Sequence, residues 1–143
     1  MEREFSAGGL VIRNMRGRPF VATVLVKGGT AHALPKGQIE PGEKGPETAV
    51  REVREETGIE AELIEKLGDV KYWYVRKWSD GQRVFKVVSF FLLRYLSGSL
   101  DDYQRSEVDG AEWVPLEDAP RVLAYKGEKD MAKLALSKLA DSG

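Results

Sequence analysis

The sequence predicts an α+β sandwich, in which helices cover the two faces of a mixed β-sheet. Segments with strand patterns lie before and after one strongly amphipathic helix, and two further helical segments close the chain. Strands and helices do not alternate regularly as in repeated βαβ units, which favours a sheet of mixed direction. The 143 residues are 42% apolar and contain neither a repeat nor a long linker, so 1–143 is expected to be a single domain.

The first third of the chain predicts strands and loops. Residues 5–13 and 20–27 have strand patterns, and the second segment is rich in Val and Leu. A glycine pair at 28–29 marks a turn. A short strand is expected over 33–35, followed by a polar loop that continues to Gly45.

The first convincing helix is expected over Pro46–Thr57. Proline suits the first helical turn, Glu47 suits its positive dipole end, and Gly58 suits the C-terminal stop. In the last helix, an apolar stripe is expected to pack in the core, and it comprises Met131, Leu134, Ala135 and Leu139. The remaining expected elements are strands over 59–67, 70–77, 84–96 and 111–114, a hairpin turn at 79–82, and helices over 115–123 and 128–139.

Composition excludes several classes of function. Lys and Arg total 22 against 23 for Asp and Glu, so the net charge of −1 argues against a duplex nucleic acid or an anionic membrane as partner. The absence of cysteine excludes disulfides, a thiol nucleophile and Cys-ligated zinc. No apolar run approaches the ~20 residues of a membrane span, and we expect a cytoplasmic protein.

The Pro46–Thr57 helix carries an unusual group of carboxylates. At about 100° per residue, Glu52, Glu55 and Glu56 occupy an arc of about 100° beside the apolar face. Like charges at these spacings destabilise an isolated helix by roughly 0.2–0.5 kcal/mol per pair. A hard divalent cation, which takes oxygen ligands and is commonly shared with substrate phosphates, explains the arrangement better than a solvated acidic face does.

The residues around this helix resemble the Nudix box. The pattern is Gly, five residues, Glu, seven residues, Arg-Glu, an aliphatic residue, any residue, Glu-Glu, any residue, Gly and an aliphatic residue. The matching positions are Gly37, Glu43, Arg51, Glu52, Val53, Glu55, Glu56, Gly58 and Ile59. The resemblance implies a Nudix-type α/β/α sandwich with a mixed sheet. It also implies a hydrolase that cleaves a nucleoside diphosphate linked to another group, with Mg²⁺ or Mn²⁺ as cofactor.

The resemblance also implies roles for individual residues. The carboxylates of Glu52, Glu55 and Glu56 and the backbone of Gly37 would hold the metal. Arg51 would orient the first of these glutamates, and an activated water would attack one phosphorus.

The resemblance also implies roles for two further acidic residues, Glu43 and Glu107. Glu43 would support the loop or an outer water. The general base stays open among Glu56, Glu55 and Glu107, which stands six residues before Trp113. Glu107 also has a plain interpretation as an exposed loop carboxylate.

Further segments resemble the diadenosine polyphosphate hydrolase subgroup of the family. Residues 34–37 match its Pro-Lys-Gly segment, in which Lys36 would bind an additional phosphate. Tyr72 and Tyr74 share one strand face, and Tyr74 is the one expected to stack on adenine, which would contribute roughly 1–3 kcal/mol. Lys86 would lie near the polyphosphate. Solvated lysines and aromatics that pack the sheet are the plain alternatives.

One departure from the subgroup pattern concerns His32, which stands where diadenosine hydrolases often carry tryptophan.

We expect a bis(5′-nucleosyl)-tetraphosphatase that cleaves diadenosine tetraphosphate asymmetrically to ATP and AMP. A nucleoside triphosphate pyrophosphatase that removes damaged nucleotides and an RNA 5′ pyrophosphohydrolase are enzyme alternatives, and a nucleotide-sensing module is the non-enzyme alternative. The oligomeric state stays open between monomer and homodimer.

Overall fold

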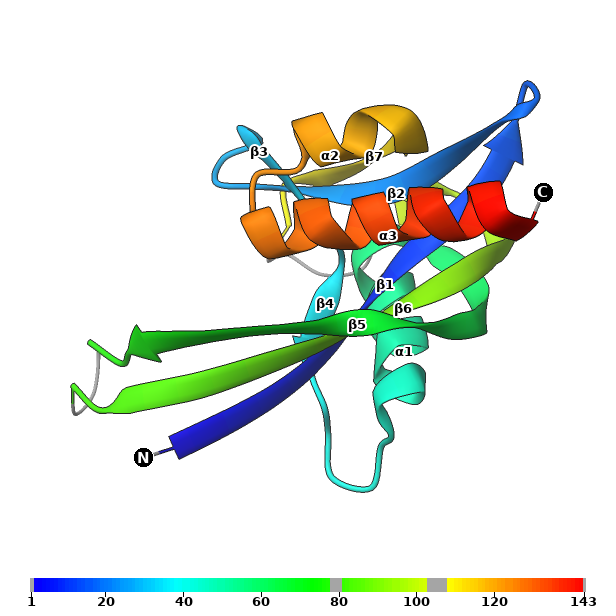
Figure 1. The fold of residues 1–143 in the computed structure, drawn as a ribbon. Coiled ribbons are helices and arrows are strands. Elements are labelled where there is room, and N and C mark those ends of the chain that lie inside the picture. The colour runs from blue at the N-terminus through cyan, green and yellow to red at the C-terminus, as the bar shows by residue number, and fades with distance from the viewer. Residues whose placement is uncertain (1, 78–80, 103–107, 143) are drawn as a thin grey trace.

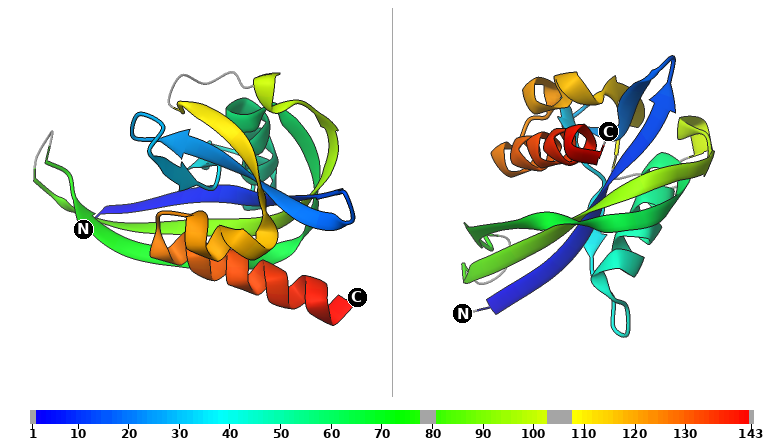
Figure 2. Two further views of the ribbon diagram at one scale, coloured as in Figure 1. Left: turned by 90° about the horizontal axis from the view of Figure 1, so that it is seen from above. Right: turned by 45° about the vertical axis from the view of Figure 1, so that its right-hand side comes forward.

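The computed structural model describes residues 2–77, 81–102 and 108–142. It has three layers, with α1 (Gly45–Thr57) on one face of a mixed sheet and α2 (Ala119–Val122) and α3 (Lys126–Ser142) on the other (Figures 1 and 2). The predicted α+β sandwich is therefore confirmed. None of the helices in the described ranges combines the length and the apolar content that a membrane crossing requires.

The sheet is built around the N-terminal strand. Its strands are β1 (Glu2–Met15), β2 (Arg18–Val26), β3 (Ala31–Ala33), β4 (Lys36–Gln38), β5 (Ile59–Val75), β6 (Arg83–Gly98) and β7 (Gly110–Pro115). The order is β3-β2-β1-β6-β5, with β4 also paired to β1 and β7 to β2. The pairing of β1 with β6 is parallel, and the other pairings are antiparallel.

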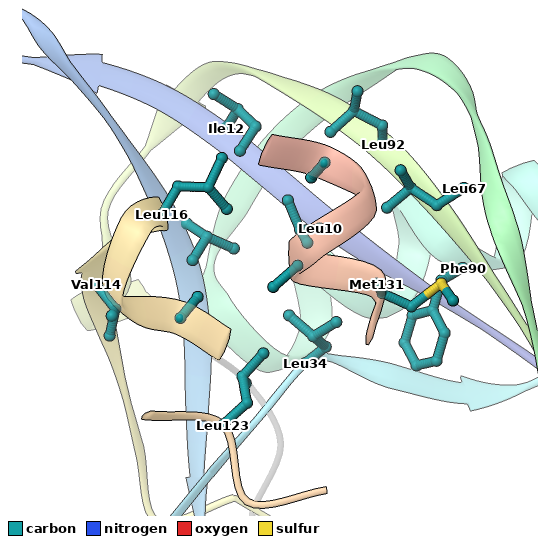
Figure 3. Close-up of a cluster of buried hydrophobic side chains, with 14 of the residues drawn as sticks. Leu10, Ile12, Leu34, Leu67, Phe90, Leu92, Val114, Leu116, Leu123 and Met131 are labelled. Carbon is teal, nitrogen blue, oxygen red and sulfur yellow. The ribbon is translucent and has the colours of Figure 1, made fainter. Parts of the chain in front are cut away.

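Two apolar clusters hold the helices on the sheet. On one face, Val53 of α1 packs with Val11 and Leu93, and all three side chains are fully buried. On the other face, Met131 of α3 lies beside Phe90 of β6 (Figure 3). The end of β5 and the starts of β6 and β1 extend beyond both helix layers (Figure 1). The carboxylates of α1 therefore lie on one face of the sheet, and α3 closes the other.

The ends of α1 follow its sequence signals. Gly58 adopts φ +78°, and its N–H donates to the carbonyl of Arg54 at 2.9 Å, so the left-handed residue that favours glycine ends the helix. At the other end, the Glu47 carboxylate accepts a hydrogen bond from the Lys44 N–H at 2.8 Å. The helix predicted to begin at Pro46 begins one residue earlier, at Gly45.

Three sequence predictions differ from the structure. The strands expected over 59–67 and 70–77 form one strand, β5, whose register shifts at bulges, including one at Gly68. The loop expected to be irregular contains β4, which pairs with residues 6–8 of β1. The helix expected over 115–123 is a 3₁₀ turn, Leu116–Asp118, followed by the short α2.

Candidate active site

Glutamates of α1 lie against the loop around β4. The side chains of Glu52 and Glu56 are only 1% and 7% exposed, although both carry carboxylates. A Cβ at residue 37 would overlap the carboxylate of Glu52, so only glycine allows this approach. Gly37 and Glu52, two positions of the predicted box that are 15 residues apart in the chain, are therefore in direct contact in space.

Arg51 joins the acidic residues of the box. Its Nε and Nη2 donate to Glu43 at 2.7 and 3.0 Å. Its Nη1 donates to Glu52 at 2.9 Å and to Glu55 at 3.1 Å. Nη2 also donates to the backbone carbonyl of Gln38 at 3.1 Å. One guanidinium thus balances three carboxylates and fixes the loop on the helix, which suits its rigid set of donors.

Glu43 anchors the loop that precedes α1. The hydrogen bond from Arg51, together with one from the Thr48 hydroxyl at 2.6 Å, lowers the pKa of Glu43 from 4.5 to about 2. Its carboxylate also accepts the Glu40 N–H at 3.2 Å. Glu43 therefore holds the loop while it is charged.

The donor set fits a hard divalent cation. Glu56 Oε1 accepts the backbone N–H of Lys36 at 3.2 Å, so a second box carboxylate also contacts the glycine loop. The nearby donors are oxygens, the ligands that Mg²⁺ and Mn²⁺ prefer. Within 2–77, 81–102 and 108–142, no three acidic or imidazole side chains are already grouped as metal ligands. The assignment of Gly37, Glu52, Glu55 and Glu56 stays a prediction.

Two neighbouring cavities share Lys36. The larger, of about 700 Å³, lies between β5, β6 and the start of α3. The smaller, of about 200 Å³, lies over the start of β4 and is lined by Lys36, Gly37, Glu4 and Lys86, among others. Lys36 and Lys86, here called the lysine pair, both line the smaller cavity.

The lysine pair is suited to an anion. Burial lowers the pKa of Lys86, and the positive charge of Lys36 lowers it further. Two ammonium groups held near one another repel, and a phosphate between them would relieve that repulsion. The structure thus brings both predicted phosphate-binding lysines to one cavity.

The two predicted base-stacking tyrosines differ in their surroundings. The Tyr74 hydroxyl donates to Glu4 Oε1 at 2.5 Å, and this bond raises the pKa of Tyr74 to about 12. Tyr72, 40% exposed, lines the larger cavity, and its ring centroid lies 6.5 Å from that of Tyr74. Of the two, the position of Tyr72 is the better suited to stack on a base.

Sequence reasoning missed several residues of the larger cavity, among them an aromatic and a buried acid. The aromatic is Tyr125, which stands just before α3 and lines the cavity together with Tyr72. Glu128, in the first turn of α3, is 4% exposed and also lines it. The signal for Glu128 was its helical spacing, since it falls on the same stripe as Met131 and Ala135.

Two other sequence candidates do not contribute to these cavities. Glu107 lies outside the described residues. His32 lines neither of the two cavities and has its Nδ1 3.0 Å from the Thr23 hydroxyl. The histidine therefore belongs to the β2–β3 edge of the sheet.

The chain resembles proteins of several described activities. MutT4 of Mycobacterium tuberculosis (strain CDC 1551 / Oshkosh) is 41% identical over 149 residues, covering 98% of this chain, and the chain spans 58% of MutT4. The RNA pyrophosphohydrolase of Novosphingobium aromaticivorans is 31% identical over 128 residues, or 80% of each chain. The crystal structure of an Ap4A hydrolase of C. elegans shares the fold, with a TM-score of 0.69 and 24% identity over 97% of this chain and 99% of that one.

The family model described as "NUDIX domain" matches residues 3–136 of the chain. The matched range includes the strands around the box as well as the box itself. That match agrees with the contacts of the box in space, where the glycine loop, the arginine and the glutamates form one network. Members of this family generally use divalent metal ions. Because the match extends over nearly all of its length, the chain belongs to the Nudix family.

Proposed function

We propose that the protein is a Mg²⁺-dependent hydrolase of nucleotide phosphoanhydrides, with diadenosine tetraphosphate as substrate and ATP and AMP as products. The observation that carries the proposal is that Lys36 lines both the aromatic cavity and the smaller cavity, while its backbone N–H donates to the box glutamate Glu56. A base, a phosphate chain and a scissile anhydride would meet these features in that order.

The chain's own groups have distinct parts in this proposal. Glu52, Glu55 and Glu56, with the backbone at Gly37, would hold the cation, and Arg51 keeps the first two carboxylates in place. When bound, the cation lowers the pKa of water and neutralises charge on the phosphates. A box glutamate would accept the proton of the attacking water, and we assign this to Glu56, whose carboxylate is held beside the loop.

A second candidate is a pyrophosphohydrolase of nucleoside triphosphates or of RNA 5′ ends. The identity with MutT4 over 98% of the chain and with an RNA pyrophosphohydrolase over 80% supports it. These reactions share the box chemistry and differ in the group beyond the scissile phosphate. We rank the dinucleotide first because the chain carries Lys36, Tyr72 and Lys86 along one path to the box.

The test is product analysis with Mg²⁺ on diadenosine tetraphosphate, 8-oxo-dGTP and 5′-triphosphorylated RNA. The proposal expects ATP plus AMP from the dinucleotide, with the highest kcat/KM of the three. Glu56→Gln is expected to fold normally and to lose about 10²–10⁴-fold in kcat, because the general base is removed.

The matched control is Glu60→Gln, an exposed glutamate just beyond the helix, which should retain full activity. Preference for a triphosphate or RNA would replace the proposed substrate with the second candidate. Nucleotide binding without metal-dependent turnover would instead support the nucleotide-sensing module. The single domain and the cytoplasmic location stay predictions.

A further inference from the structure

Glu128 is a buried acid that the proposed reaction does not use. Its side chain lies at the start of α3, and its Oε1 accepts the backbone N–H of Leu34 at 2.7 Å. Burying a carboxylate is unfavourable unless its oxygens are hydrogen-bonded. In keeping with this, burial raises the pKa of Glu128 despite the Leu34 hydrogen bond and the positive charge of Lys36.

The second oxygen of the Glu128 carboxylate, Oε2, is the one that can interact with a ligand in the cavity. Within the parts of the chain that the structure describes, the Glu128 carboxylate accepts no hydrogen bond other than the one from Leu34. The residue lines the cavity of about 700 Å³, so Oε2 is the atom available to a group that enters it. A charged carboxylate oxygen accepts hydrogen bonds and cannot donate them.

The rest of the cavity combines aromatic and apolar surfaces, which suit a flat base, with charged residues such as Asp69, Lys71 and Asp130. Tyr72 and Tyr125 are both partly exposed, at 40% and 38%, and both line it. Val70, Phe90 and Met131 supply apolar walls, and Figure 3 shows Met131 against Phe90. The volume is within the range of ordinary ligand sites, and aromatic rings can stack on any nucleobase.

The cavity is also placed to hold the base of a phosphorylated ligand. Lys36 lines both it and the smaller cavity beside Gly37, so a base near Glu128 would direct its phosphates toward the box. Stacking alone would not distinguish one base from another. Asp69 and Asp130 also line the cavity, but Glu128 is the buried one of these three acids, so its acceptor is the one most shielded from water.

We propose that Glu128 determines base specificity by accepting a hydrogen bond from the 6-amino group of adenine. Guanine presents N1–H and a 2-amino group side by side, which suits a carboxylate with two available oxygens. Here Oε1 already accepts the Leu34 N–H, so Oε2 is the oxygen left without a hydrogen bond, and a single amino group suits it. The inference deepens the proposed function and rests on it for the identity of the substrate.

The first test changes the ligand and leaves the protein intact. Hypoxanthine has an oxygen where adenine has the amino group, and this oxygen would face Oε2 without a donor between them. We expect wild-type kcat/KM for diadenosine tetraphosphate to exceed that for diinosine tetraphosphate by about 10-fold or more. AMP should bind more tightly than inosine 5′-monophosphate by a similar factor in calorimetry.

The second test reverses the polarity of the side chain. In Glu128→Gln the amide oxygen can still accept the Leu34 N–H, while the amide nitrogen would present donors to the cavity. The ratio of adenine to hypoxanthine substrate should therefore fall to near one or invert. A merely structural role would leave this ratio unchanged while lowering both rates together. Asp141→Asn, at the exposed end of the same helix, is the control and should retain the wild-type ratio.

The outcomes separate this inference from the proposed function. If no tetraphosphate is hydrolysed but AMP still binds more tightly than inosine 5′-monophosphate through Glu128, the proposed reaction fails and the assignment of Glu128 stands. Equal binding and turnover of the two bases by the wild-type protein would overturn the assignment. An unchanged ratio in a folded Glu128→Gln variant, checked by circular dichroism, would overturn it as well.

Discussion

Gly37 shows how one missing side chain shapes the site. The carboxylate of Glu52 occupies the space that a Cβ at residue 37 would need, and Arg51 Nη1 donates to the same carboxylate at 2.9 Å. Because Glu52 is 1% exposed, it has little room to move away. The Glu52 carboxylate can therefore keep its position only because residue 37 is a glycine, which has no side chain.

Replacing this glycine should affect chemistry more than folding. In Gly37→Ala the methyl group must displace the Glu52 carboxylate, and a shift of about 1 Å at a reacting centre lowers rates about 100-fold. We expect kcat/KM to fall by about that factor, measured with saturating Mg²⁺. Ser97→Ala, at an exposed position of β6 that lines neither cavity, should remain close to wild type. Wild-type activity in Gly37→Ala would contradict the close packing described here.

At the scale of elements, the contact of α3 with β5 forms one wall of the larger cavity. Gly127, in the first turn of α3, is so close to β5 that an added Cβ would lie 2.5 Å from Val70 Cγ1. Both residues line the cavity beside Glu128. The small residue allows the helix to approach the strand and places Glu128 under Leu34.

Adding a methyl group at this contact should destabilise the fold. Overpacking costs typically about 1–3 kcal/mol, which outweighs the gain of about 0.5–1 kcal/mol that alanine brings to a helix. Gly127→Ala should therefore lower the free energy of unfolding in urea by about 1 kcal/mol. Lys133→Ala, at an exposed position of α3, serves as the comparison. Equal or higher stability of Gly127→Ala would show that α3 is not tightly packed on β5.

Local sequence signals predicted the box helix, since its proline, glutamates and Gly58 lie within one element. They could not predict β4, because three residues carry no pattern and the strand forms only where residues 6–8 offer an edge. Glu128 was missed because a glutamate in a first helical turn is ordinarily solvated. Leu134, predicted to be in the core, is 40% exposed, and Ala132 is buried in the core instead. The tertiary contact of α3, not its spacing alone, decides these outcomes.

For the whole molecule, the acidic residues couple stability to pH. Glu43 has a pKa of about 2 in the folded protein against 4.5 as the ordinary value, and the hydrogen bond from Arg51 is the main cause. The unfolded chain therefore binds this proton more readily than the folded chain does. The resulting stability is fully present above about pH 4.5 and is lost as the pH falls toward 2.

Replacing Glu43 by glutamine should weaken the dependence of the free energy of unfolding on pH. In EDTA, we expect wild type to be more stable than Glu43→Gln above pH 4.5, with the difference shrinking as the pH approaches 2. Urea unfolding at several pH values measures it. Glu117→Gln, an exposed acid beside α2, should follow the wild-type profile. Parallel profiles for wild type and Glu43→Gln would contradict the role of Arg51 as its partner.

The parallel pairing of β1 with β6 also determines the order in which the molecule can assemble. Residue 2 pairs with residue 84, and residue 12 with residue 94, so the central pair of the sheet joins distant parts of the chain. The chain loses the conformational entropy of closing this long loop before the favourable contacts between β1 and β6 form. Folding is slowed for this reason. During synthesis on the ribosome, β1 has no partner on this side until β6 has emerged. The cavity that contains Lys36 and Lys86 therefore forms only after more than half of the chain has been made.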